Sequence, residues 1–412
     1  MSKIEELINE LCPNGVEYKR LIDLGKFYGG LTGKSKEDFK DGNANFITYI
    51  NVYNNPSLRL DLDDKVKIGP NENQRRLEYC DVIFTGSSET QDECALSSVV
   101  TEVPTEDYYL NSFCFIWRMD DNSIFNPHFL KHLFRSEELR KQLIRTASGV
   151  TRYNVSKKEM EGVEIPIPPR PIQDEIVRIL DNFTNLTAEL TAELTARKEQ
   201  YEYYRDNLLK FDSDVKLVNL ESVCEISTGS SNTSDSVDNG IYPFFVRSQE
   251  PLKKNTFEFD EEAIITAGDG VGVGKVFHYI NGKYALHQRA YRIHPISNDL
   301  NGRFLFHYFQ TIFPKYILSK MFEGSVPSIR RPMLNEFKVF LPSLDVQERI
   351  VNVLDNFEKI CNDLKIGLPA EIELRQKQYE YYRDLLLTFP ERGFTMAQAS
   401  KQASKQASKQ AS

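Results

Sequence analysis

Apolar residues recur along two segments of this chain at the spacing of an amphipathic helix. From Ile172 they continue at positions 176, 179, 183, 186 and 190, and from Val346 at 350, 353, 357, 360 and 364. Steps that alternate between four and three residues place the side chains in a stripe that packs lengthwise on another helix. The first pattern predicts a helix from about residue 172 to about Phe211. The second pattern is followed by Gly367-Leu368-Pro369, where we predict that the helix stops and a new helix begins.

These two segments are copies of each other. The matching blocks are 172–183 and 346–357 (IQDEIVRILDNF and VQERIVNVLDNF), followed by 200–209 and 378–387 (QYEYYRDNLL and QYEYYRDLLL). A looser match joins residues 16–30 to residues 215–229. The chain is therefore an internal duplication, and duplicated chains tend to present two similar surfaces related by a pseudo-twofold axis.

The regions that precede the copied helices have a mixed α/β pattern. Short apolar runs predict strands, and longer periodic runs predict helices at 127–145 and 301–321. The predicted strands are Phe46–Val52, Asp81–Thr85, Phe113–Trp117, Ile241–Val246 and Ala263–Thr266. Long polar, glycine-rich loops separate them, as base and phosphate contacts require. From the residues alone, the chain is a two-lobed recognition protein.

Composition changes this picture little. The net charge of −9 counts mildly against nucleic-acid binding, although a local basic stripe can still contact phosphates. The six cysteines are scattered without a CxxC pair, which fits a reducing compartment. The sequence contains no run of about 18 apolar residues and no apolar signal core at its start, so a cytoplasmic protein with no membrane segment is expected.

Motifs for catalysis are incomplete. The glycine-rich run 268–275 lacks the first glycine and the Ser or Thr of a phosphate loop, so a hairpin turn is predicted there. His128 and His132 have the spacing of a zinc pair but no third ligand, and we interpret them as part of a surface helix. Asn126-Pro127-His128 is not an adenine-methyltransferase motif, and Glu336-Phe337-Lys338 lacks the upstream Pro-Asp of a nuclease site. No nucleophile, base and orienting group can be assembled.

The duplicated blocks resemble the specificity subunit (HsdS) of type I restriction-modification systems. The proline-rich entries at 165–168 and 340–342 belong to the same pattern, and the tandem TAELTAEL at 187–194 is similar to the subgroup called type IC. The resemblance covers about 1–389. It implies an α/β fold with two mixed α/β target recognition domains, separated by two long conserved helices that form an antiparallel coiled coil. The expected divisions are 1–168 for the first target recognition domain, 169–211 for the central helix, 212–342 for the second domain, 343–389 for the distal helix and 390–412 for a low-complexity, disordered tail.

The resemblance also implies a non-catalytic subunit that recognises a bipartite double-stranded DNA site. Its partners would be two modification (methyltransferase) subunits and restriction subunits. S-adenosylmethionine, ATP and Mg²⁺ would serve adenine-N6 methylation and ATP-dependent cleavage in those partners, with no cofactor or metal in this chain. A protein-binding scaffold with duplicated coiled-coil helices is the alternative, and a single-chain enzyme with an unrecognised site is another.

Under this resemblance, DNA contacts are expected in the polar loops. Arg and Gln form bidentate hydrogen bonds with guanine and adenine edges, whereas Lys pairs with phosphates. The candidate DNA contacts are Arg152, Arg247, Lys275, Gln288, Arg289, Arg330 and Arg331, together with Lys34, Lys36 and Lys40, which are interpreted as phosphate contacts. Solvated surface charge is the alternative for each of them. Leu186, Leu190 and Leu194 are predicted to form the stripe of a helix that sets the spacing between the half-sites.

Overall fold

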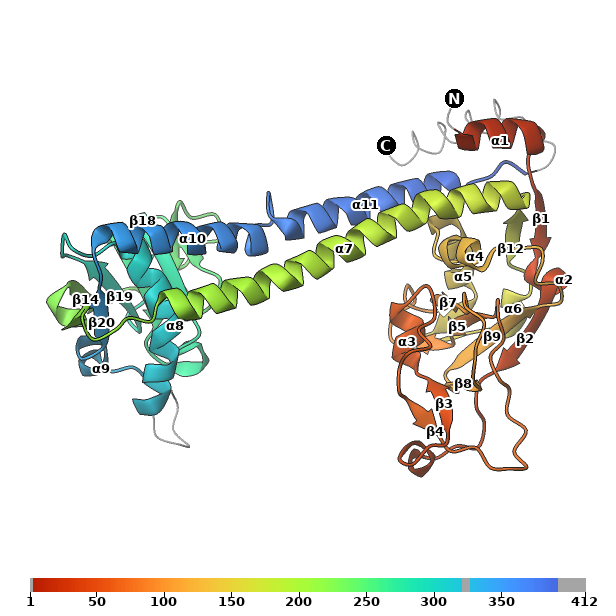
Figure 1. The fold of residues 1–412 in the computed structure, drawn as a ribbon, viewed down its shortest axis with the longest axis horizontal. Coiled ribbons are helices and arrows are strands. Elements are labelled where there is room, and N and C mark those ends of the chain that lie inside the picture. The colour runs from red at the N-terminus through yellow and green to blue at the C-terminus, as the bar shows by residue number, and fades with distance from the viewer. Residues whose placement is uncertain (1–2, 321–326, 392–412) are drawn as a thin grey trace. The chain divides into compact units, whose positions relative to one another are not determined.

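The computed structural model describes residues 3–320 and 327–391. Within these described residues the chain forms two compact units, of which unit 1 lies within the ranges 1–189 and 373–412 and unit 2 within the range 190–372. Each unit combines sheets and helices with a part of the long helix α7 (Arg170–Leu208), which confirms the predicted mixed α/β class (Figure 1). From residue 392 onward, the predicted tail lies outside the described residues.

Unit 1 is built on a four-stranded antiparallel sheet with the order β2-β9-β5-β7. Trp117 and Phe84 from its strands pack on Phe134, and the Trp117 indole Nε1–H donates to the carbonyl of Leu21 at 3.1 Å. Smaller sheets pair β1 with β12, β3 with β4 and β8, and β11 with β10 and β6. The elements of this unit, apart from α7 and α11, are α1 (Lys3–Leu11), β1 (Glu17–Arg20), α2 (Leu21–Leu24), β2 (Gly25–Gly29), η1 (Lys36–Phe39), β3 (Ala44–Ile47), α3 (Tyr49–Asn54), β4 (Lys65–Val66), β5 (Val82–Thr85), β6 (Ser87–Ser88), β7 (Ser97–Val99), β8 (Tyr108–Leu110), β9 (Cys114–Met119), α4 (Pro127–Leu133), α5 (Glu137–Arg145), β10 (Ala147–Gly149), β11 (Tyr153–Val155), α6 (Lys157–Met160) and β12 (Glu164–Ile167).

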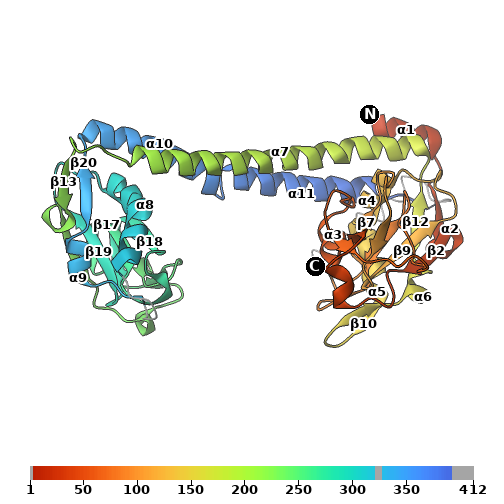
Figure 2. The ribbon, with the colours of Figure 1, turned by 60° about the horizontal axis from the view of Figure 1, so that its bottom comes forward.

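Unit 2 is built on a six-stranded sheet with the order β14-β19-β17-β18-β15-β16. Helix α8 packs on β17 and β18 (Figure 2), where Phe309, Phe313 and Phe337 form a buried aromatic core. The elements, apart from α7 and α11, are β13 (Lys216–Asn219), η2 (Leu220–Ser222), β14 (Cys224–Thr228), η3 (Thr233–Asp235), β15 (Tyr242–Phe245), β16 (Leu252–Lys254), β17 (Phe259–Ala267), η4 (Gly270–Gly272), β18 (Phe277–Leu286), β19 (Ala290–Pro295), α8 (Gly302–Lys320), α9 (Arg331–Asn335), β20 (Lys338–Leu341) and α10 (Leu344–Asn362).

The two units repeat one topology, as the looser sequence match predicts. β1 pairs with β12 in unit 1 and β13 pairs with β20 in unit 2, and both pairs are antiparallel. Among the strands that the structure describes, each unit also has a parallel pair, β3 with β8 in unit 1 and β15 with β18 in unit 2. The predicted turn at 268–275 is confirmed, because Thr266 and Phe277 are antiparallel partners on either side of it.

The duplicated helices pack on each other within each unit. α7 is 39 residues long, and the second copy is divided into α10 and α11 (Leu368–Leu386). The stop and restart predicted at Gly367-Leu368-Pro369 is confirmed, with the interruption lying between Asn362 and Leu368. In unit 1, Phe183 stacks on Tyr382 with ring centroids 5.3 Å apart, and in unit 2 the equivalent Phe357 stacks on Tyr204 at 5.5 Å. Leu186, Leu190 and Leu194 are half-buried along one face of α7.

Three sequence-based predictions were wrong in detail. The predicted strand Phe46–Val52 ends at Ile47, because the Thr48 hydroxyl accepts the backbone N–H of Asn51 and begins α3. The predicted helix at 127–145 is two helices, α4 and α5, interrupted before Glu137. His132 is not on a surface helix: its side chain is 1% exposed and it bonds to α7.

Candidate nucleic-acid interface

Several polar loops of unit 2 meet around the end of β17. The backbones of Ser231 and His287 pair in an isolated parallel β-bridge. The backbone N–H of Gly268 donates to the carbonyl of Arg289 at 2.8 Å. On the other side, the N–H of Ile329 donates to the carbonyl of Gly268 at 2.7 Å. The segments brought together are 229–232, 246–249, 268–275, 287–289 and 327–331.

Three predicted contact residues lie together in these loops. Arg247 Nη1 lies 2.5 Å from Asp269 Oδ1, and Arg289 Nη1 lies 3.3 Å from Asp269 Oδ2. Gln288 donates its amide N–H to the side-chain oxygen of Asn232. Burial and then the positive charges of Arg247 and Arg289 lower the pKa of His287, so this imidazole is neutral near pH 7.

The remaining candidates of unit 2 are exposed beside this cluster. Lys275 is exposed, and its carbonyl accepts the side-chain N–H of Gln249 at 2.8 Å. Arg330 and Arg331 are exposed at the start of α9, directly after Ile329, whose N–H is bonded to the β17 turn. Unit 2 therefore presents its predicted cations and amide on adjoining loops.

In unit 1, Arg152 lies in the exposed turn between β10 and β11. Its guanidinium donates to the Ser87 hydroxyl at 3.0 and 3.3 Å, which ties the turn to β6. The same guanidinium lies 5.6 Å from the ring centroid of Phe113, whose side chain is 58% exposed. An exposed aromatic ring beside an arginine is a surface on which bases can stack.

The three candidate lysines lie before, in and directly after η1, and they differ in their surroundings. Lys34 donates to the Glu72 carboxylate at 2.6 Å and to the carbonyl of Lys67 at 2.5 Å, so it joins two loops. The pKa of Glu72 falls to about 2 through hydrogen bonds from the Gly69 backbone, Lys34 and Gln74. Lys36 and Lys40 are exposed, and Lys40 pairs with Glu37 at 2.8 Å.

Sequence reasoning missed Asp269, Asn232 and Phe113. Asp269 stands where a phosphate loop would have its first glycine, and Asn232 belongs to a polar run without apolar periodicity. Phe113 was assigned to a strand, but β9 begins one residue later. An aspartate between two arginines that are distant in sequence gives no signal in a linear pattern.

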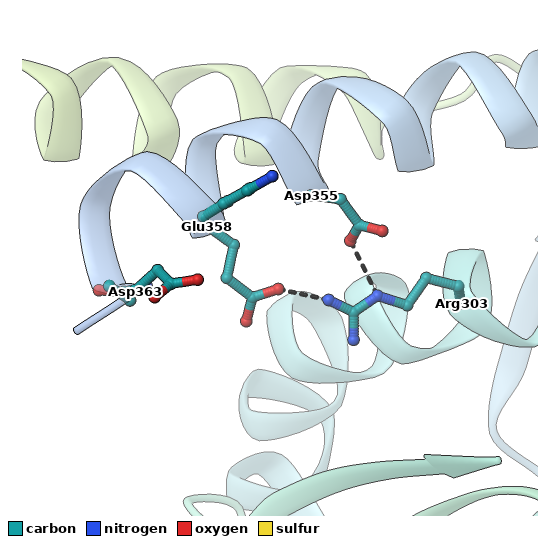
Figure 3. Close-up of a pocket in the computed structure, with 6 residues that line it drawn as sticks. Arg303, Asp355, Glu358 and Asp363 are labelled. Carbon is teal, nitrogen blue, oxygen red and sulfur yellow. Dashed lines mark hydrogen bonds and ion pairs between the residues drawn. The ribbon is translucent and has the colours of Figure 1, made fainter. Parts of the chain in front are cut away.

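A cluster that resembles a metal site, His307, Asp355 and Glu358, lies between α8 and α10 in unit 2. Figure 3 shows Asp355 and Glu358 with their shared partner Arg303. His307 Nε2 lies 2.6 Å from the Asp355 carboxylate, and Glu358 lies one turn further along α10. Arg303 donates to Asp355 at 2.8 Å and to Glu358 at 2.5 Å, so a guanidinium already compensates both carboxylates. We interpret the cluster as the anchor of α8 on α10.

Two α/β units that display polar loops and share a duplicated helix pair define a two-lobed recognition protein. Residues 13–199 and 212–374 match the family model described as type I restriction modification DNA specificity domain. The chain belongs to this family, whose members are specificity subunits and not catalytic ones. Among the helices of the described residues, none is both long and apolar enough to cross a bilayer.

Relatives and solved structures agree with this assignment. The specificity subunit of the Escherichia coli type I restriction enzymes EcoR124I and EcoR124II is 36% identical over 268 residues, which cover 58% of this chain and 66% of that protein. A Mycoplasma pneumoniae protein described as the putative type I specificity subunit S.MpnORF365P is 31% identical over 260 residues, 60% of this chain and 94% of its own length.

The fold is also that of solved specificity subunits. The type I restriction-modification S subunit from M. genitalium aligns with a TM-score of 0.54 and 13% identity over 92% of this chain and 98% of its own. A chain from a study titled as the structural basis of complex assembly and conformational transition of the type I R-M system aligns with a TM-score of 0.58 and 17% identity, covering 91% of this chain and 98% of that one.

Proposed function

We propose that this chain recognises a bipartite double-stranded DNA site, one half-site with each lobe. The first lobe is the α/β part of unit 1, and the second lobe is that of unit 2. The observation that carries the proposal is the cluster of Arg247, Gln288 and Arg289 on adjoining loops of unit 2. Such side chains form the bidentate contacts that distinguish guanine and adenine. Arg152 beside Phe113 is the corresponding candidate in unit 1.

The partners follow from the family. The chain is proposed to dock two modification subunits and the restriction subunits, which use S-adenosylmethionine, ATP and Mg²⁺ for adenine methylation and DNA cleavage. The complex is proposed to be cytoplasmic, and the TAEL tandem at 187–194 supports the proposal that it belongs to the type IC-like subgroup. The net charge of −9 of this chain does not exclude DNA binding, because the candidate contacts form a local group of positive charge.

Selection from a library of randomised duplexes tests the proposal. The full chain, assembled with its modification subunits, is expected to enrich two short motifs separated by an unspecified spacer, with an affinity that falls steeply as salt rises. The alternative, a protein-binding scaffold, predicts assembly with partners but no enriched motif. A single continuous motif would contradict the two-lobe model.

A further inference from the structure

Asp269 lies at the centre of the loops that carry the candidate contacts of unit 2. Its two carboxylate oxygens accept from different arginines, Oδ1 from Arg247 at 2.5 Å and Oδ2 from Arg289 at 3.3 Å. The Asp269 side chain is 27% exposed, against 41% for Arg247 and 60% for Arg289. Charge-assisted hydrogen bonds to one carboxylate therefore set the direction of both guanidinium groups, while much of each stays open to solvent.

The backbone around Asp269 is fixed on both sides. The N–H of Gly268 donates to Arg289, and the N–H of Gly270 donates to the carbonyl of Pro327 at 2.9 Å. A Cβ at Gly268 would lie 2.6 Å from the Arg289 carbonyl oxygen, and Gly270 has a φ of +79°. Glycine is needed at both positions, one for close approach and one for the left-handed backbone. The carboxylate is thus held in place by the loops that it joins.

The charge of Asp269 is unfavourable for general DNA affinity, because a carboxylate repels phosphates. Between two arginines, however, it screens their mutual repulsion and leaves one net positive charge. An arginine offers five N–H donors, so one bond to Asp269 leaves others for a base edge. A carboxylate that lowers the affinity for DNA in general, but orients two arginines toward base edges, favours discrimination between DNA sequences over general attraction to DNA.

We propose that Asp269 is a positioning residue for sequence recognition by the second lobe, holding Arg247 and Arg289 in the orientation in which they bind base edges. This inference rests on the proposed function. It assigns Asp269 no contact with DNA of its own. The residue acts through the two arginines, and its effect is confined to one half-site.

The test compares Asp269→Asn with Asp260→Asn in the full chain assembled with its modification subunits. Asp260 is exposed near the start of β17, the strand that ends at Ala267, and the two substitutions remove the same charge. Binding is measured on the selected site, on duplexes altered in one half-site, and on unrelated duplex, with melting curves to verify folding. Asp269→Asn is expected to lower discrimination at the second half-site about tenfold, and to leave unrelated duplex bound as well or better.

Discrimination at the first half-site is expected to stay unchanged, and Asp269→Glu, which keeps the charge, is expected to recover part of the loss. A structural role alone would weaken binding to every duplex together and lower the melting temperature, which would overturn the inference. Asp269→Asn behaving like Asp260→Asn, while the wild-type chain discriminates normally, would overturn it as well. A wild-type chain without any site preference would overturn the proposed function along with it.

Discussion

Arg330 and Arg331 are exposed beside the turn that follows β17. We expect the double substitution to alanine to reduce preference for the second half-site by at least tenfold, since each good bidentate contact contributes about 1–3 kcal/mol of discrimination. Binding curves on matched and mismatched duplexes measure this. Lys315→Ala, which removes an exposed charge on α8, is the control. Unaltered discrimination would exclude this pair as base contacts.

Asp181 on α7 anchors α4 of the first lobe. Its carboxylate lies 2.7 Å from His132 Nε2 and 2.8 Å from Lys131 Nζ, and His132 Nδ1 lies 2.9 Å from the Tyr379 hydroxyl. Burial opposes ionisation of Asp181, but the hydrogen bonds from His132 and Lys131 outweigh it and lower the pKa to about 2. Burial also lowers the pKa of His132, so a neutral imidazole can donate from Nε2 and accept at Nδ1.

A depressed carboxyl pKa gives stability that is present above the ordinary value near 4 and is lost as pH falls toward 2. Asp181→Asn is therefore expected to cost about 2 kcal/mol at pH 7, and to flatten the acid-induced loss of stability between about pH 4 and pH 2. Chemical denaturation across this range measures both. Asp174→Asn, on the same helix but more exposed, should change little. Equal effects of the two substitutions on stability would contradict the role of Asp181 as the anchor of α4 on α7.

At the scale of elements, the duplicated long helices could be predicted from the sequence. Apolar residues at helical spacing reveal a long helix, because the stripe that they form must be buried. α7, α10 and α11 begin and end close to the predicted residues. The strand at Phe46 was predicted too long because a Thr48 cap ends it, and an apolar run does not reveal a cap. His132 was misplaced because its partners, Asp181 and Tyr379, are distant in sequence.

The TAEL tandem on α7 is predicted to set the spacer between half-sites. One added unit of four residues lengthens a helix by about 6 Å and turns its far end by about 40°. One added base pair shifts a half-site by about 3.4 Å and about 34°. A third TAEL is expected to lengthen the accepted spacer by one base pair, because helix tilt or DNA bending can absorb the difference in length.

The test measures methylation of duplexes whose spacers differ in length. It compares the chain with two TAEL repeats and a chain with three. A two-residue insertion serves as the control: it turns the stripe of Leu186, Leu190 and Leu194 by about 200° and should abolish assembly. An unchanged spacer preference in the three-unit chain would show that another element sets the distance, with the break before Leu368 as the next candidate.

At the scale of the whole molecule, each lobe attaches to the duplicated helices through the same contacts. Gln173 accepts the N–H of Asn126 at 2.8 Å, and its equivalent, Gln347, accepts the N–H of Asn301 at 2.8 Å. The bond between His132 and Asp181 recurs as the bond of His307 with Asp355. Because both lobes are attached by the same contacts, the sequences of their loops can differ while the attachment to the helices stays the same. The loop contacts themselves could not be predicted, because they depend on side-chain directions that only the fold supplies.

Exchange of the first lobe tests the central claim most directly. Residues 1–168 are replaced by the first lobe of another family member, and the methylated motif is determined by methylome sequencing of cells that carry either chain with the same modification subunits. We predict that one half-site changes to that of the donor, while the other half-site and the spacer stay as they were. A change in both half-sites together, or in neither, would contradict recognition of one half-site by each lobe.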